Sequence, residues 1–198
     1  MQESYQADTA ILSQFQAVGR DLFQRGLVSS HSGNLSLRLG DSLVITRRGC
    51  MLGDIRDLDL IETRLDRSDR ISPLASSELA VHRAVYLHSE ARAVVHAHPP
   101  HAITLSFTEK EVVPCDGEGV KLLPLVPVLG GVGITPRDIA DSIAEALKEH
   151  HIVLVYGHGC FAAGQLLEET LLWTTALEES CHILFLLKTL GRQPRPVA

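Results

Sequence analysis

The sequence predicts a single α/β domain. Segments with apolar residues at helical spacing alternate along the chain with short β-branched runs of strand length. At 198 residues, the chain is long enough for one well-packed domain and short for two. It contains no linker, internal repeat or low-complexity segment. We therefore expect residues 1–198 to form one domain.

In the first half of the chain, each expected element follows from a local pattern. Amphipathic spacing predicts the first helix, which Gly26 can end as a C-cap. Two alternating runs flank Gly40-Asp41 and predict a hairpin. A stretch rich in Asp and Arg is expected to be a surface loop with a short strand near 58–61. The expected elements are a helix at 9–25, strands at 35–39 and 43–46, the loop at 54–70, a helix at 77–89 and a strand at 93–97.

The second half of the chain is punctuated by prolines. Three of them interrupt 112–128, which favours short irregular strands. Thr135-Pro136-Arg137-Asp138 resembles a capping box with proline at the first helical position, and predicts a helix to about residue 149. The other expected elements are a short helix at 100–107, strands at 152–155 and 160–163, and a long helix at 166–190 that is broken at most once.

Composition excludes several classes of protein. The net charge of −6 and the absence of a Lys/Arg cluster argue against nucleic-acid binding. The longest apolar run, 183–187, is too short to span a bilayer, and the N-terminus shows no secretory signal. The scattered cysteines form no CxxC pair and are expected to be reduced thiols in a cytoplasmic protein. They are Cys50, Cys115, Cys160 and Cys181.

Three histidines are candidates for a metal site. His96 and His98 end an apolar run with one residue between them, so they share one face of the predicted strand. His158 follows a second apolar run and is flanked by glycines, which allow the backbone to approach closely. His101 stays open as an alternative third ligand, and Cys160 as a ligand or, preferably, a buried apolar residue. Three imidazoles and a carboxylate form a zinc-type site that leaves a position for substrate.

Glu78 is the candidate carboxylate. It is predicted in the first turn of the helix opened by Ser76-Ser77. The helix macrodipole favours an acidic residue there even when that residue has no functional role. His82, four residues later, is either a partner of Glu78 or a surface residue. His88, His150 and His151 are expected to be structural or solvated.

Three turns are candidates for binding an anion. Ser76-Ser77 offers hydroxyls and free backbone N–H groups at a helix N-terminus. Gly33-Asn34 and Arg47-Arg48-Gly49 are polar turns that could close around a phosphate. Each signal is weak alone, since such turns are common and an arginine pair is often simply solvated.

Together, these segments resemble the class II aldolase/adducin family. The resemblance runs from about residue 14 into the C-terminal helix. The Ser-Ser-Glu and His-x-His segments, at the spacing found here, are specific for this family, whereas Ser-Gly-Asn alone is not. The matching segments are Ser32-Gly33-Asn34-Leu35-Ser36-Leu37-Arg38, Ile45-Thr46-Arg47-Arg48-Gly49, Pro73-Leu74-Ala75-Ser76-Ser77-Glu78, Val94-Val95-His96-Ala97-His98 and Gly157-His158-Gly159.

The resemblance implies a three-layer α/β/α sandwich around a mostly antiparallel central sheet, assembled as a homotetramer with active sites at subunit interfaces. It implies that Zn²⁺ is bound by His96, His98 and His158. Glu78 would be a fourth ligand at rest and the catalytic acid/base once substrate displaces it. The residues that would bind the substrate phosphate are Asn34, Gly49, Ser76 and Ser77.

Two departures from the family pattern affect this expectation. Arg48 stands where the aldolases commonly have threonine, which alters or strengthens the phosphate site. The type enzyme also uses a tyrosine from a neighbouring subunit as a proton donor. Because residues 112–126 contain no tyrosine, the second proton-transfer group of this chain is unidentified.

The predicted function is a zinc-dependent aldolase. It would reversibly cleave a phosphorylated ketose, such as L-fuculose 1-phosphate, to dihydroxyacetone phosphate and an aldehyde through an enediolate. A sugar-phosphate epimerase, which usually has Asp in place of Glu78, and methylthioribulose-1-phosphate dehydratase are alternatives with the same site. A non-catalytic adducin-like interaction module is a third alternative, and a histidine-rich metal-storage protein is disfavoured. Mn²⁺ or Co²⁺ could replace zinc.

Overall fold

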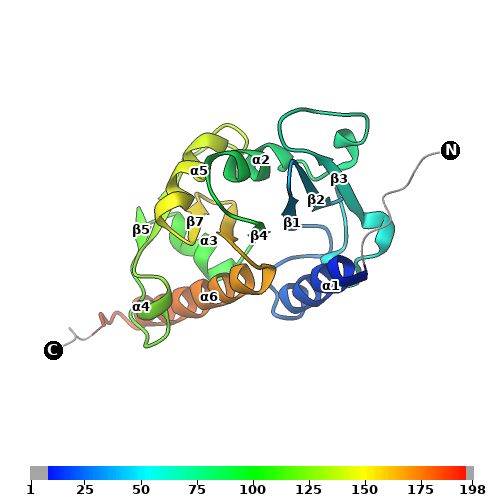
Figure 1. The fold of residues 1–198 in the computed structure, drawn as a ribbon. Helices are drawn as coiled ribbons and strands as arrows, with labels where there is room; N and C mark the ends of the chain where they lie inside the picture. The colour runs from blue at the N-terminus through cyan, green and yellow to red at the C-terminus, as the bar shows by residue number, and fades with distance from the viewer. Residues whose placement is uncertain (1–8, 195–198) are drawn as a thin grey trace.

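The computed structural model describes residues 9–194. Within this range, six α helices and eight strands form one α/β fold (Figure 1). The helices are α1 (Thr9–Gln24), α2 (Leu79–His88), α3 (Pro100–Ser106), α4 (Gly119–Leu122), α5 (Ala140–Glu149) and α6 (Leu167–Thr189). The strands are β1 (Asn34–Leu39), β2 (Ser42–Thr46), β3 (Leu60–Arg64), β4 (Ala93–Ala97), β5 (Glu111–Val112), β6 (Val126–Leu129), β7 (Ile152–Val155) and β8 (Gly159–Gly164).

All the strands belong to one mixed sheet. Their order is β3-β2-β1-β4-β8-β7-β6-β5, and every neighbouring pair is antiparallel except β6 and β7. Strand β4 lies between β1 and β8, and its register places His96 opposite Asn34 on one side and Phe161 on the other. The expectation of a mostly antiparallel sheet is confirmed, and it places the first candidate ligand at the sheet centre.

Helices cover both faces of this sheet. In Figure 1, α1 and α6 lie below the sheet and α2 and α5 lie above it. Each face has its own apolar core: Phe15 of α1 and Leu177 of α6 belong to one, and Val85 of α2 and Ile143 of α5 to the other. Since β4 is buried along its whole length, its apolar run serves both cores. The predicted three-layer α/β/α sandwich is therefore confirmed.

Most element boundaries agree with the sequence patterns, and the differences have local causes. The helix expected from residue 135 begins only at Ala140, because the Asp138 carboxylate accepts hydrogen bonds from both the backbone N–H and the hydroxyl of Thr135 and closes a separate turn. The expected strand near 58–61 is β3, which begins at Leu60. A short helix, α4, interrupts the irregular strands of the proline-rich region. Helix α6 is continuous.

Three expectations from composition concern membrane spans, a secretory signal and the cysteines. Within residues 9–194, no helix combines the length and the apolar character that crossing a membrane requires. The expected absence of a secretory signal concerns residues 1–8, which lie outside the described residues. The four cysteines all have free thiols, in agreement with the reduced state that their spacing predicted.

Candidate metal centre and anion pocket

Three imidazoles meet at the centre of the sheet. His96 lies in β4, His98 follows that strand directly, and His158 lies in the turn between β7 and β8. The Nε2 atoms of His96 and His98 are 2.8 Å apart, and one nitrogen from each of the three rings lies within 4.8 Å of the others. A tetrahedral divalent ion with bonds of about 2.1 Å needs donor atoms roughly 3.4 Å apart. The three rings are therefore within reach of one ion.

The local sequence explains this convergence. Antiparallel pairing of β4 with β8 brings the start of β8 beside the two strand histidines. A Cβ on Gly159 would lie 2.9 Å from His98 Cδ2 and 3.1 Å from His96 Cε1, so only glycine allows this approach. His96 Nδ1 lies 2.8 Å from the Cys160 carbonyl oxygen, to which its N–H donates. This bond fixes the ring and leaves His96 Nε2 available as a ligand atom.

The Glu78 carboxylate faces these imidazoles. Glu78, predicted in the first turn of this helix, is the N-cap residue of α2, one position before the helix begins, and its side chain makes no capping hydrogen bond. Instead, Oε1 lies 2.9 Å from His158 Nε2, and Oε2 lies 3.2 Å from His96 Nε2. Asn34 Nδ2 donates a further hydrogen bond of 2.7 Å to Oε2. The carboxylate therefore belongs to the histidine cluster and not to the helix terminus.

The protonation states of the cluster suit a metal ion. Burial lowers the pKa of His96, and it lowers the pKa of His98 to about 3. Burial, the largest single effect, would alone raise the pKa of Glu78, but the electrostatic effect of His96 and the hydrogen bonds from His158 and Asn34 together outweigh it. The pKa of Glu78 is about 2 as a result. Neutral imidazoles beside an ionised carboxylate are the forms that bind divalent metals.

One hollow of about 270 Å³ contains every site residue predicted from the sequence. The histidine cluster and the three polar turns all line it. Its lining residues are His31, Ser32, Gly33, Asn34, Arg47, Arg48, Gly49, Ser76, Ser77, Glu78, His96, His98 and His158. The arrangement can accommodate a small molecule with an anionic group at one end and metal-binding oxygens at the other.

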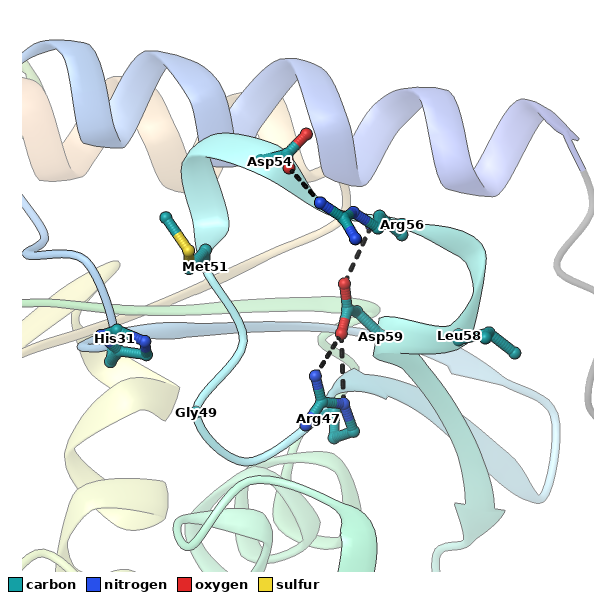
Figure 2. A pocket seen from close by; sticks show the side chains of 8 residues that line it. All are labelled: His31, Arg47, Gly49, Met51, Asp54, Arg56, Leu58 and Asp59. Carbon is teal, nitrogen blue, oxygen red and sulfur yellow. Dashed lines mark hydrogen bonds and ion pairs between the residues drawn. The ribbon is translucent and has the colours of Figure 1, made fainter.

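The two arginines beside this hollow differ in their partners. Arg47 is paired with Asp59, with Nη2 and Oδ1 2.6 Å apart, as Figure 2 shows. Among the described residues, the exposed guanidinium of Arg48 has no carboxylate partner. Arg48 is therefore the cation available to bind an anion. The alternative that both arginines are simply solvated is wrong, because Arg47 forms an ion pair.

A second hollow of about 410 Å³ continues from the first. The two share His31, Arg47 and Gly49, and Figure 2 shows Met51 and Leu58 among the other lining residues. Sequence reasoning did not consider His31, whose neighbouring residues are small and polar and give no metal-ligand pattern. It is an imidazole at the mouth of the site.

The alternative ligands lie elsewhere. His101 Nδ1 is 2.7 Å from Glu178 Oε1, and its ring stacks on His182 at a centroid distance of 4.1 Å. Cys160 is fully buried, which raises the pKa of its thiol to about 12, and it belongs to the apolar core beneath the sheet. Neither residue takes part in the cluster of His96, His98 and His158.

His82 is not a surface residue. Its side chain is completely buried, with Nε2 2.5 Å from Asn34 Oδ1 and Nδ1 2.6 Å from Ser36 Oγ. Its ring reaches the Glu78 carboxylate through Asn34, whereas its backbone N–H donates to the Glu78 carbonyl oxygen at 3.3 Å. The alternation of Asn34 and Ser36 along β1 was the available sequence signal for a buried polar partner.

The chain matches a known protein family over most of its length. The sequence model of the class II aldolase and adducin N-terminal domain matches residues 13–185. The chain belongs to the class II aldolase/adducin family. This family member is similar in structure to L-fuculose-1-phosphate aldolase from Thermus thermophilus, with 39% identity and a TM-score of 0.87, covering 96% of this chain and 100% of the other.

Curated relatives of this class II aldolase/adducin chain have different names. It is 27% identical to 3-oxo-tetronate 4-phosphate decarboxylase from Escherichia coli K12, over 94% of this chain and 92% of the relative. It is 29% identical to a probable bifunctional methylthioribose-1-phosphate isomerase/methylthioribulose-1-phosphate dehydratase from Nocardia farcinica, over 84% of this chain. It spans only 34% of that longer protein. The family thus includes aldolases, dehydratases and decarboxylases, each named for a phosphorylated substrate.

Proposed function

We propose that this protein is a metal-dependent class II aldolase that cleaves a phosphorylated ketose, such as L-fuculose 1-phosphate, to dihydroxyacetone phosphate and an aldehyde. One observation carries the proposal: the Glu78 carboxylate lies 2.9 Å from His158 and 3.2 Å from His96, in the same hollow as Arg48 and the serine turn. An acid/base, a metal-ligand cluster and an anion site thus share one cavity. The similarity to the Thermus thermophilus aldolase supports the same reaction.

In this proposal, His96, His98 and His158 hold a divalent ion. Zinc is the ion we propose, because three imidazoles and a carboxylate suit it. Such an ion supplies a Lewis acid for the negative charge that develops when a carbon–carbon bond beside a carbonyl breaks. Glu78 would be a further ligand before substrate enters, and with substrate bound its carboxylate would transfer the proton to and from the carbon that loses its bond.

In this proposal, the polar turns that line the hollow bind the substrate phosphate. Gly49, with a positive φ of 71°, and the exposed Ser77, just before α2, both line the hollow. The Ser76 hydroxyl accepts a hydrogen bond from the Glu78 backbone N–H, which fixes the serine turn against the start of α2. The Asn34 amide is bonded to Glu78 in this structure and becomes available to phosphate when Glu78 moves. Arg48 adds a positive charge.

A dehydratase is the second candidate. The similarity to the Nocardia farcinica protein favours it, because elimination of water beside a carbonyl uses the same Lewis acid and the same carboxylate. A decarboxylase has comparable support from the Escherichia coli relative. Glu78 disfavours the epimerases, which usually have Asp there. The complete set of histidines disfavours a non-catalytic adducin-like module.

A substrate screen separates these reactions. Purified protein loaded with Zn²⁺ is incubated with ketose 1-phosphates, ketose 5-phosphates and a 3-oxo acid phosphate, and aldehyde, water-elimination product and CO₂ are measured. We expect aldehyde release, a loss of at least a hundredfold in Glu78→Gln, and little change in Glu145→Gln, which alters an exposed glutamate of α5. Elimination or CO₂ release without aldehyde would replace the aldolase proposal by one of the alternatives.

We also propose a cytoplasmic homotetramer with sites at subunit interfaces. The apolar side chains that α6 exposes near its C-terminal end support an oligomer, since such patches often mark contact surfaces. They are Ile183, Phe185, Leu186 and Leu190. Light scattering on the purified protein gives the mass directly, and a monomer at assay concentrations would exclude an interface site.

A further inference from the structure

A row of buried polar side chains connects the core to Glu78. Asn34 and Ser36 lie two positions apart on β1 and both face α2. His82 of α2 spans them, with Nε2 2.5 Å from Asn34 Oδ1 and Nδ1 2.6 Å from Ser36 Oγ. One turn further along α2, the Tyr86 hydroxyl lies 2.6 Å from the same Ser36 oxygen. The exposed fractions of all four side chains are 6% or less.

The donor and the acceptor of each hydrogen bond in this row can be assigned by starting from Glu78. A carboxylate only accepts, so the Asn34 Nδ2 group donates to Glu78 and the Asn34 oxygen must accept from His82 Nε2–H. Burial lowers the pKa of His82 to about 3, so the neutral ring has one N–H and its Nδ1 accepts from the Ser36 hydroxyl. The Ser36 oxygen then accepts from Tyr86. Every donor points toward the carboxylate.

The inner end of the row lies beside the strand of the metal-ligand candidates. Burial raises the pKa of Tyr86, so its hydroxyl keeps its proton and can donate it to Ser36. The backbone of Val94, two residues before His96 on β4, is close enough to lower this pKa in part. The row therefore starts beside the strand that carries His96 and reaches the cluster through Glu78.

We propose that this row, the buried relay of Tyr86, Ser36, His82 and Asn34, positions the Glu78 carboxylate, with His82 as the positioning residue. An amide without the His82 donor can rotate by half a turn and present its oxygen to the carboxylate, which repels it. The His82 N–H prevents this rotation, since only one face of the Asn34 amide matches it. The inference rests on the proposed function only for the catalytic role of Glu78.

This relay has a mechanistic advantage over an ion pair. The Asn34 amide is a neutral donor, so it orients Glu78 without permanently neutralising it, and Glu78 can still accept a proton. A chain of aligned donors in a buried region strengthens each successive bond. The carboxylate consequently has a defined position between His96 and His158 before any substrate arrives.

The tautomer of His82 is the first test. Long-range ¹H–¹⁵N correlation spectra of metal-free protein labelled at histidine report which ring nitrogen is protonated, and His82→Gln identifies the signal by its loss. We expect the neutral Nε2–H form. A neutral Nδ1–H form or a protonated ring at pH 7 would overturn the relay and would leave the proposed aldolase activity untouched.

Two substitutions of His82 form a matched pair. In His82→Gln, the amide lies near the former Nε2 and can still donate to Asn34, whereas in His82→Asn it reaches only the former Nδ1 position beside Ser36. We expect Gln to keep kcat within about threefold of the wild type, and Asn to lower kcat roughly tenfold or more with little change in KM. Equal losses in the two variants would show that His82 acts by packing alone, and would overturn the proposal.

Cobalt binding gives a readout that does not depend on the reaction. If the relay holds Glu78 as a ligand, His82→Asn should weaken Co²⁺ binding about tenfold and change the d–d absorption bands, and His82→Gln should retain both. Identical Co²⁺ spectra and affinities in all three proteins would overturn the relay. If the protein shows the expected Co²⁺ pattern but releases no aldehyde, the relay is supported and only the aldolase proposal is wrong.

Discussion

Gly159 lies directly against His98, and the space between them is too small for any side chain. A Cβ on Gly159 would be 2.9 Å from His98 Cδ2 and would also contact the Ala97 carbonyl oxygen. The glycine therefore sets how closely β8 approaches the end of β4. The positions of the candidate ligands depend on that approach, because His158 is the residue immediately before Gly159.

Gly159→Ala should separate the two parts of the histidine cluster. We expect about 1–3 kcal/mol of overpacking, relieved by movement of the His98 ring and of the turn at His158, and at least a tenfold loss of Zn²⁺ affinity. Gly117→Ala is the matched control, because a Cβ there meets nothing within 4 Å. Competition titration with a chromogenic chelator measures both variants. Unchanged affinity in Gly159→Ala would mean that the cluster tolerates the shift.

The third ligand can be tested by comparing two histidines. His158→Ala should abolish stoichiometric zinc binding after dialysis, since one of the three imidazole ligands is lost and only His96, His98 and the Glu78 carboxylate remain. His101→Ala should retain one bound zinc, because the His101 ring contacts Glu178 and His182 instead. Metal analysis after dialysis gives the stoichiometry. Loss of zinc from His101→Ala but not from His158→Ala would reverse the assignment.

Arg48 should contribute to substrate binding more than to the chemical step. We expect Arg48→Ala to raise KM for a phosphorylated substrate about tenfold and to leave kcat within about threefold, since a phosphate contact far from the breaking bond acts equally on ground and transition states. Arg56→Ala is the control, because Arg56 is exposed and paired with Asp54. Steady-state kinetics separates the two constants, and a loss confined to kcat would contradict this role.

Asp69 should make stability depend on acid pH. Partial burial alone would raise its pKa, but hydrogen bonds from Thr63, Ser72 and Arg64 outweigh burial and lower the pKa below its usual range. Because the folded-state pKa is depressed, the stabilisation is complete above the unfolded pKa of about 4 and is lost as pH falls below it.

Asp69→Asn should therefore cost about 1 kcal/mol at pH 7, after allowance for solvent screening, and the difference from wild type should shrink below about pH 4. Urea unfolding at several pH values measures it. Asp66→Asn, which changes an exposed aspartate of the same loop, should show a smaller difference at pH 7. A difference for Asp69→Asn that grows toward pH 3 would contradict the expected sign.

Local patterns predicted the elements well where one physical signal dominated. The run at β4 is uniformly apolar and β-branched up to His96, so both the strand and its burial could be read from the sequence. The Asp138 carboxylate accepts from the Thr135 backbone N–H as in a capping box, but the Asp138 N–H donates to the Thr135 carbonyl oxygen, and the helix begins five residues after Thr135. A cap motif specifies a turn, and only packing against the neighbouring elements decides where the helix starts.

The candidate site could be predicted in its residue types but not in its connections. The sequence identified His96, His98, His158 and Glu78, because histidine pairs on a strand face and glycine-flanked histidines are uncommon. It left His82 undecided between a partner and a surface residue. Burial of His82 depends on the pairing of β1 with β4 and on α2 lying over both, and none of these is a local property.

By itself, the sequence determined the class of this protein: an α/β fold with histidines at or beside strand ends, a carboxylate and polar turns in a family-specific order. Periodicity and residue chemistry act over a few neighbouring residues, so they can be read directly from the chain. Only the tertiary structure decided that Arg47 and not Arg48 pairs with Asp59, that His101 turns to Glu178, and that Asn34 joins His82 to Glu78. Such choices depend on which distant segments the sheet brings within about 3 Å of each other, and hydrogen bonds and ion pairs are decided at that distance.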